Sequence, residues 1–280
     1  MKKLHGKIWP KLGLFSAFAW VTVSYAGFAY AKQERISFTG SRPIDMLANQ
    51  LEENLGVAIS YEDPVYFAPR DVEKTEVIAR SGPNHWIITP RDQEITIDQI
   101  ALPKGASKGD KRLYDVAATS LTQAIKSIAR LENAARFEIR RSDTRLEVVP
   151  THIKLKDGAY GKFSPLLDTI ITVDIDSDAY SAISAICDAL SDATGQTVKN
   201  GIATAPNPFM NTHVRVKPEP RKARDIVSDI LGIVSEDENM TWELRYHPEE
   251  KVWVLSFSIS SYFVMSKPDL NPALLHSEQQ

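Results

Sequence analysis

Apolar residues in "RPIDMLANQLEENLGVAISYE", residues 42–62, recur at steps of three and four before the pattern changes to alternation. This spacing predicts a helix of about three turns with one apolar face. Pro43 suits the first helical position, and Gly56 suits the residue just past the end. Alternating segments on either side predict strands, so the unit reads strand, helix, strand. The apolar positions of the helix are Ile44, Leu47, Leu51 and Leu55.

The same pattern returns in "TIITVDIDSDAYSAISAICDALSDATGQTV", residues 169–198. Its helix is expected to end at Gly195, as the first ends at Gly56. The two helices match position by position, which unrelated amphipathic helices need not do. The corresponding apolar sets are Ile44, Leu47 and Leu51, and Ile183, Ile186 and Leu190.

A strand, a helix and a hairpin are expected after each of these units. In the first copy Leu113 and Val116 are assigned to the strand, and in the second copy Val214 and Val216. The order strand, helix, strand, strand, helix, strand, strand therefore occurs twice. It predicts an α+β protein of two tandem small domains, each with two helices packed on small mixed sheets, produced by duplication.

The expected domain boundaries follow from this repeat. Domain 1 covers residues 32–153 and carries an insertion around 62–110, which contains its own alternating segments and is interpreted as an added hairpin or loop excursion. Residues 154–168 are expected to form a linker, and domain 2 covers 169–264. Residues 265–280 are expected to form a polar C-terminal tail.

The first 31 residues have the layout of a secretory signal peptide. Four lysines precede an apolar run that closes with the small-residue pattern Ala29-Tyr30-Ala31. We expect cleavage after Ala31 and a periplasmic or secreted protein, with a retained membrane anchor as the alternative.

The net charge and the cysteine content limit the kinds of partner and of covalent link that we expect. The net charge is −3, and the signal segment holds four lysines and no acidic residue, so cleavage would leave −7. An acidic protein has no general electrostatic attraction to nucleic acid. Cys187 is the only cysteine, which excludes an internal disulfide. No membrane span is expected after signal cleavage.

The phrases "PIDMLANQLEENLGVAISYE" and "SLTQAIKSIARLENAARFEIRRSDTRLEVV" resemble the short N-terminal domain shared by secretins and TonB-dependent receptors. Both phrases recur in weaker form at residues 179–198 and 222–257. The resemblance implies a periplasmic module that contacts other envelope proteins and does no chemistry. The ring-forming repeats, gate, plug or barrel of that family do not follow, so we do not expect a channel.

Sequence patterns of known chemistry are missing. No glycine-rich phosphate loop, nucleophile elbow or zinc-protease motif occurs. Asp174, Asp176 and Asp178 lack the glycine and glutamate of a calcium loop, and Ser177 or Asp178 is expected to cap a helix. Cys187 falls on an apolar helical face. We therefore expect no catalytic residue, no metal site and no cofactor. The scattered histidines, which lack metal-ligand spacing, are His85, His152, His213, His247 and His276.

Two groups of residues are candidates for binding a partner protein. The aromatic group flanks the insertion, and its alternative role is the insertion's own small core. The basic group lies on the first hairpin, where it could instead keep an edge strand from pairing. The candidates are Tyr61, Tyr66, Phe67 and Trp86, and Arg136, Arg140, Arg141 and Arg145.

Together these features predict a non-catalytic protein-interaction module of the bacterial cell envelope, accessory to secretion or uptake machinery. One alternative is an extracytoplasmic enzyme with a cleft between the two domains, which requires His85, His152 or His213 beside acidic residues. The other is a self-assembling structural protein that uses exposed sheet edges. A homo-oligomer is compatible with each.

Overall fold

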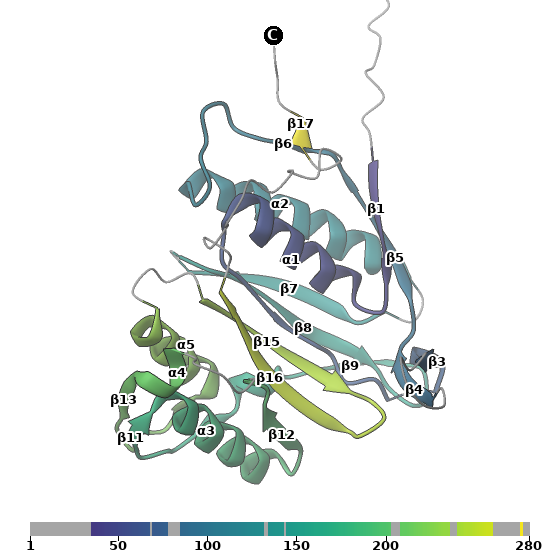
Figure 1. Cartoon of the computed structure of the whole chain (residues 1–280). Helices are drawn as coiled ribbons and strands as arrows, with labels where there is room; N and C mark the ends of the chain where they lie inside the picture. The colour runs from purple at the N-terminus through teal and green to yellow at the C-terminus, as the bar shows by residue number, and fades with distance from the viewer. Residues whose placement is uncertain are drawn as a thin grey trace, which may run out of the picture. The chain divides into compact units, whose positions relative to one another are not determined.

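The computed structural model describes residues 35–67, 69–77, 85–131, 134–142, 144–202, 208–235, 240–259 and 275–276. The expected signal peptide and most of the expected tail lie outside these ranges. The described residues form one compact unit of helices and strands, which confirms the α+β class (Figure 1). Among the described residues, no helix is long and apolar enough to span a membrane.

We call residues 35–153 the first half and residues 166–259 the second half. The first half contains β1 (Arg35–Gly40), α1 (Pro43–Leu55), β2 (Ile59–Glu62), the 3-10 helix η1 (Pro69–Asp71), β3 (Val72–Val77), β4 (His85–Pro90), β5 (Gln93–Asp98), β6 (Ile100–Ala101), α2 (Lys111–Ile128), β7 (Arg136–Arg141) and most of β8 (Leu146–Lys154).

The strand β9 (Tyr160–Lys162) lies between the two halves. The second half contains η2 (Leu166–Asp168), β10 (Ile170–Ile171), β11 (Ile175–Asp178), α3 (Ala179–Thr194), β12 (Thr197–Asn200), α4 (Pro208–Asn211), β13 (His213–Val216), β14 (Arg221–Lys222), α5 (Ala223–Val234), β15 (Met240–His247) and β16 (Val252–Ile259). A last short strand, β17 (Leu275–His276), pairs with β6.

Helices α1 and α3 end as their sequences predict. Pro43 occupies the first helical position of α1. Gly56 and Gly195 follow the last helical residues with φ of 65° and 68°, in the left-handed region that favours glycine. Asp178 caps α3 by accepting a hydrogen bond of 2.9 Å from the backbone N–H of Ser181, which confirms the predicted cap.

The start of α2 corrects the sequence prediction. Leu113 and Val116 lie inside the helix and not on a strand, because Asp110 caps it and the apolar spacing of three and four begins at Leu113. The strands before α2 are β5, which pairs antiparallel with β1, and the short β6. The segment 62–110 therefore supplies a strand to the first half as well as the separate hairpin β3–β4.

One sheet of seven strands runs through both halves, in the order β12-β16-β15-β2-β8-β7, with β9 pairing to β8. The halves meet where β2 lies parallel to β15, with Tyr61 opposite Glu243 and Glu62 opposite Leu244. This long-range pairing places β2, which ends at Glu62, near the centre of the sheet.

Strand pairing follows the same plan in each half. The parallel pairs β2–β8 and β12–β16 correspond, as do the antiparallel pairs β7–β8 and β15–β16 and the two-stranded sheets β1–β5 and β11–β13. The hairpin β3–β4 has no counterpart among the described strands of the second half. Two tandem domains with a boundary at 154–168 stay a prediction, since strands from both sides share the large sheet.

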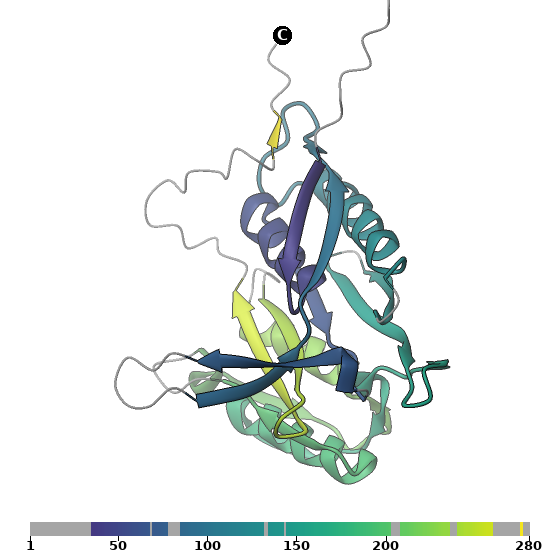
Figure 2. The same cartoon turned by 90° about the vertical axis from the view of Figure 1, so that its right-hand side faces the viewer.

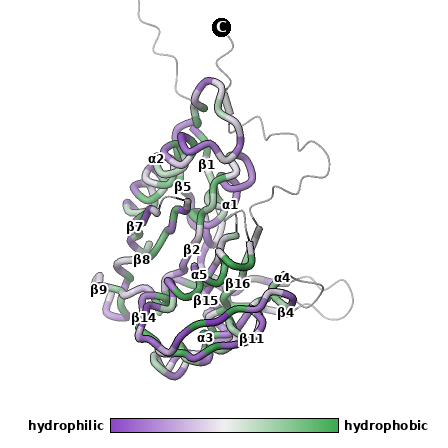
Figure 3. The backbone as a smooth tube through the Cα atoms, turned by 90° about the vertical axis from the view of Figure 1, so that its left-hand side faces the viewer, coloured by the Kyte–Doolittle hydropathy of each residue, from purple (hydrophilic) through white to green (hydrophobic). Residues whose placement is uncertain are grey.

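The apolar faces of the helices form two cores. Leu47, Leu51 and Leu121 are fully buried between α1, α2 and the sheet, and Trp242 and Trp253 are fully buried in the second half. Hydrophobic and hydrophilic stretches alternate along these elements (Figure 3), as amphipathic helices and half-buried strands require.

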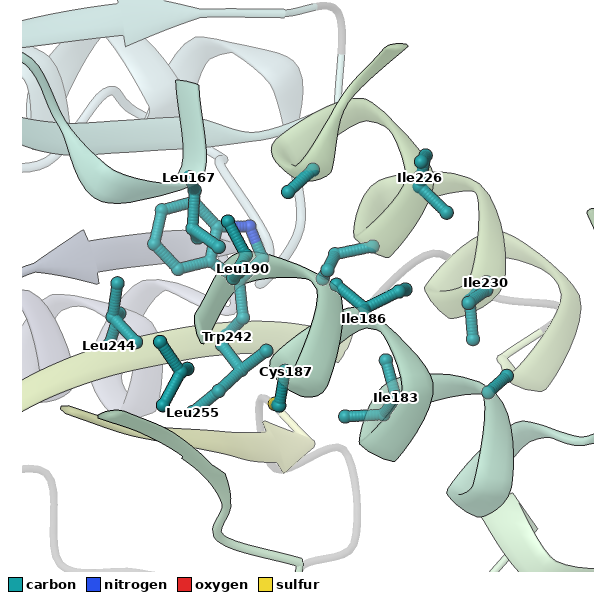
Figure 4. Close-up of a cluster of buried hydrophobic side chains, with 14 of the residues drawn as sticks. Leu167, Ile183, Ile186, Cys187, Leu190, Ile226, Ile230, Trp242, Leu244 and Leu255 are labelled. Carbon is teal, nitrogen blue, oxygen red and sulfur yellow. The ribbon is translucent and has the colours of Figure 1, made fainter. Parts of the chain in front are cut away.

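The second core also takes in residues from the first half and from the expected linker. Val65, which follows β2, belongs to this core, as do Leu166 and Leu167 of η2. Figure 4 shows Leu167 beside Leu190 and Trp242. Residues 62–65 and 166–168 therefore connect the first half to the second core by packing.

Candidate functional site

A buried guanidinium lies where the two halves meet. Arg224 of α5 binds Glu62 at 2.8 Å, Glu147 at 2.9 Å and Asp168 at 2.8 Å. Its guanidinium also lies over the ring of Trp242, 4.9 Å from the centroid. Burial opposes the charge of Arg224, yet the carboxylates, Glu62 first, raise its pKa above the ordinary value. We call these five residues the Arg224 cluster.

Glu62 is the most deeply buried of the charged residues in this cluster. Its side chain is fully buried, and burial raises its pKa to about 7 against the attraction of Arg224. One carboxyl oxygen accepts a hydrogen bond from Arg224 and the other from the backbone N–H of Leu166. Both oxygens are thus occupied by groups that hold the halves together.

A second buried carboxylate, Asp63, accepts hydrogen bonds from four donors. Arg42 donates to it at 2.7 Å and Tyr61 at 2.9 Å, while Tyr66 and the backbone N–H of Tyr246 donate at 3.2 and 3.0 Å. Arg42 also binds the carbonyl oxygen of Tyr246 at 2.8 Å. Two of the predicted partner-binding aromatics, Tyr61 and Tyr66, therefore serve this internal site.

A third group lies between α1 and β15. Arg245 binds Asp45 at 2.9 Å and Glu243 at 2.7 Å. Glu52 accepts a hydrogen bond of 2.7 Å from the backbone N–H of Ile59. Burial raises the pKa of Asp45 to about 7 and that of Glu52 to about 8. We call Asp45, Glu52, Glu243 and Arg245 the α1–β15 acid cluster.

Arg145, one of the predicted partner-binding residues, lies inside the protein. It is 8% exposed, and it donates to the carbonyl oxygen of Met240 at 2.9 Å and to the hydroxyl of Ser228 at 3.2 Å. Arg145 and Tyr61, which is 2% exposed, are thus not surface residues and contact the other half of the chain or its own core instead.

The other three predicted arginines lie on β7, at one end of the large sheet. Each binds another part of the chain, so the basic run is largely compensated internally. This also leaves the edge-protecting role open, because charged side chains on an edge strand disfavour pairing with another chain. Arg136 binds the carbonyl oxygen of Ala129, Arg140 binds Glu138 and Asp168, and Arg141 binds Asp115.

Phe67 and Trp86 are the predicted aromatics that reach the surface. Phe67 is 45% exposed, and Trp86, on β4, is 59% exposed. The hairpin β3–β4, dark blue in Figure 2, extends to one side of the large sheet and pairs with no other described strand. The backbone N–H of Ile88 donates to Glu249, in the turn between β15 and β16, at 3.1 Å.

A cleft of about 640 Å³ opens beside β7, β8 and β9 and reaches the C-terminal end of α3. This volume suits a small ligand or a short peptide segment. His152 lines the cleft together with Glu138 and Asp168, but the contact of its ring in this structure is with the hydroxyl of Thr151, at 3.2 Å. Both carboxylates instead bind Arg140.

The remaining reactive groups have structural contacts. Cys187 is buried in the second core (Figure 4), where burial raises the pKa of its thiol to about 12. His213 lies 2.7 Å from Asp176 on the exposed pair β11–β13. No cluster of histidine, cysteine or acidic residues suited to a metal ion occurs within the described ranges.

The Arg224 cluster was missed from the sequence, although Arg224 carried a signal. It falls on the apolar stripe of α5 with Val227 and Leu231, three and seven residues later. A charge on a buried stripe requires a buried partner.

Comparison with known proteins finds no matching protein-family model, no matching curated protein and no matching solved structure.

Proposed function

We propose that the protein is a non-catalytic interaction module of the bacterial cell envelope, which binds a partner protein through the hairpin β3–β4 and Phe67. We call this surface the aromatic arm. The resemblance to the short N-terminal domain of secretins and TonB-dependent receptors supports a periplasmic setting and a role accessory to secretion or uptake machinery.

The exposure of Trp86 carries this proposal. Tryptophan is enriched among the residues that dominate binding energy at interfaces, and Trp86 is 59% exposed. A hairpin of two strands has little stability by itself, so a partner that covers it gains backbone and side-chain contacts together. The hairpin of the arm also has no counterpart among the described strands of the second half.

The use of the buried ionisable groups supports a non-catalytic role. Glu62 and Asp63 have their oxygens occupied by arginine, tyrosine or backbone donors. The thiol of Cys187 is buried and protonated at neutral pH, since its pKa is about 12. Glu62 and Asp63 hold the two halves together, and Cys187 fills a core. In the part of the chain that the structure describes, none of these three side chains faces a cavity in which a substrate could bind.

Site-specific crosslinking tests the arm. A photo-crosslinking amino acid in place of Lys74, exposed on β3, is expected to capture a defined envelope protein. Trp86→Ala or Phe67→Ala should weaken this capture by about tenfold, about 1.4 kcal/mol. Ile170 is 64% exposed and lies on β10, so the same amino acid placed there is the matched control. Equal capture from both positions, or capture from neither, would contradict the proposal.

The cleft favours a second candidate, an extracytoplasmic enzyme. His152 shares this cleft with Glu138 and Asp168, as a general acid or base with nearby carboxylates would. This candidate predicts that small substrates protect His152 from modification by diethyl pyrocarbonate and that His152→Ala abolishes turnover. A partner that binds through the arm leaves His152 open to diethyl pyrocarbonate. Protection of His152 from this reagent by a small substrate therefore distinguishes the enzyme from the interaction module.

A further inference from the structure

The α1–β15 acid cluster has more carboxyl groups than it has cations. Asp45 and Glu52 lie seven residues apart on one face of α1, and Glu243 and Arg245 lie on one face of β15. Arg245 serves both Asp45 and Glu243. Glu52 is left with the backbone N–H of Ile59, at 2.7 Å, and a hydrogen bond to the side chain of Thr241.

The charged groups that face Glu52 do not compensate a negative charge on it. From β15 and from α1 itself, Glu243 and Asp45 both oppose ionisation. The two arginines that interact with Asp45 bind other carboxylates, since Arg245 binds Asp45 and Glu243 and Arg42 binds Asp63. An ionised Glu52 would therefore be a buried, uncompensated charge, which is costly in any protein interior.

A protonated Glu52 fits the site without this cost. Its neutral carboxyl can still accept the hydrogen bond from Ile59 and can share one with the hydroxyl of Thr241. The hydroxyl of Thr241 lies 2.7 Å from that of Ser258 on the next strand, so the hydrogen bonds continue into β16. The protonated carboxyl thus keeps a polar contact between a helix of the first half and the sheet of the second without a buried charge.

We propose that Glu52 is a proton-operated latch: α1 and β15 are held together while its carboxyl carries a proton, and the contact loosens when the proton leaves. The sign follows from the direction of the shift. The pKa of Glu52 in the folded protein, about 8, lies above its ordinary value, so the protonated carboxyl is favoured by folding. The stabilisation is fully present below the ordinary value and is lost as the pH rises through about 8.

Hydrogen–deuterium exchange of the full chain between pH 6 and pH 9 tests the latch. After correction for the intrinsic exchange rate, opening of α1 and β15 should rise in the wild type by up to tenfold per pH unit between pH 6 and about pH 8, and it should level off above that. Glu52→Gln keeps an acceptor for Ile59 and carries no charge, so it should remove this rise. Glu53→Gln changes the adjacent, exposed residue of the same helix and should leave the rise as in the wild type.

The position of the transition separates a latch from a merely structural residue. Glu243→Gln removes a neighbouring negative charge and should move the transition to lower pH, which loss of packing alone would not do. Carbon-13 NMR of the wild type measures the titration of Glu52 directly, even if Glu52→Gln does not fold. A titration midpoint near the ordinary glutamate value, or an unchanged pH profile in Glu52→Gln, would overturn the proposal.

Discussion

Arginine at position 224 illustrates how one buried side chain determines the contact between two halves of a chain. Its guanidinium compensates three carboxylates that come from β2, β8 and η2. A buried ion pair of this kind adds little stability over an apolar contact, but removal of one partner leaves an uncompensated charge. The Arg224 cluster therefore determines which surfaces of the two halves meet, and it adds little to the stability of their contact.

Arg224→Ala should lower the free energy of unfolding by about 3–5 kcal/mol at pH 8, because Glu62 is left buried without its cation. At pH 5 the loss should be smaller, since Glu62, whose pKa is already raised to about 7, binds a proton more readily. Urea unfolding at the two pH values measures this difference.

Arg221 on β14 provides the control for that experiment. It pairs with Asp229 at 2.7 Å, and the two side chains are 35% and 59% exposed. Arg221→Ala should cost less than about 1 kcal/mol at either pH. Equal losses for the two arginine variants would show that burial of Arg224 has no special effect.

Among the elements, helices α1 and α3 end in the same way but in different surroundings. A side chain at Gly195 would meet open space, whereas a Cβ atom at Gly56 would lie 3.1 Å from the backbone nitrogen of Gly109. Both glycines have positive φ. The difference between the two sites is therefore one of packing and not of backbone conformation.

Gly195→Ala should cost about 1–2 kcal/mol, the usual penalty for a side chain in the left-handed region. Gly56→Ala should cost more, because the loop that contains Gly109 must also shift. Thermal unfolding of the two variants, compared with the wild type, measures the difference. A smaller loss at Gly56 than at Gly195 would contradict the close packing seen around Gly56.

Local sequence signals predicted much of the secondary structure. Pro43, Gly56 and Gly195 mark helix ends through backbone preferences that act within a few residues. The start of α2 was misassigned, because Leu113 and Val116 fit a strand in a short window and a helix only when later residues are included. Trp86 was identified from its residue type, while its exposure depends on the tertiary structure.

Pairings between distant segments could not be predicted in this way. The position of β2 against β15 depends on Asp63 accepting from Tyr246, and on Arg145 reaching Met240, contacts that no local pattern encodes. The sequence predicted the repeated order of elements, and it gave no indication that both copies would contribute to one sheet.

Across the whole molecule, the shared sheet and the buried ion pairs couple the two cores. We expect one cooperative unfolding transition, because neither half can separate without exposing Glu62, Asp63 and Arg224. Tryptophan fluorescence should report mainly the second core through Trp242 and Trp253, and hydrogen exchange in α1 should report the first. Urea midpoints that differ between these two probes would contradict the coupling.

The parallel pairing of β2 with β15 has a consequence for biosynthesis. β2 leaves the ribosome well before its neighbour on one side, β15, has been made. Until then that edge of β2 remains open, and open edges invite pairing with other chains. Nascent protein should therefore depend on a holding chaperone until the hairpin β15–β16 has been made, and truncation before Met240 should yield aggregates.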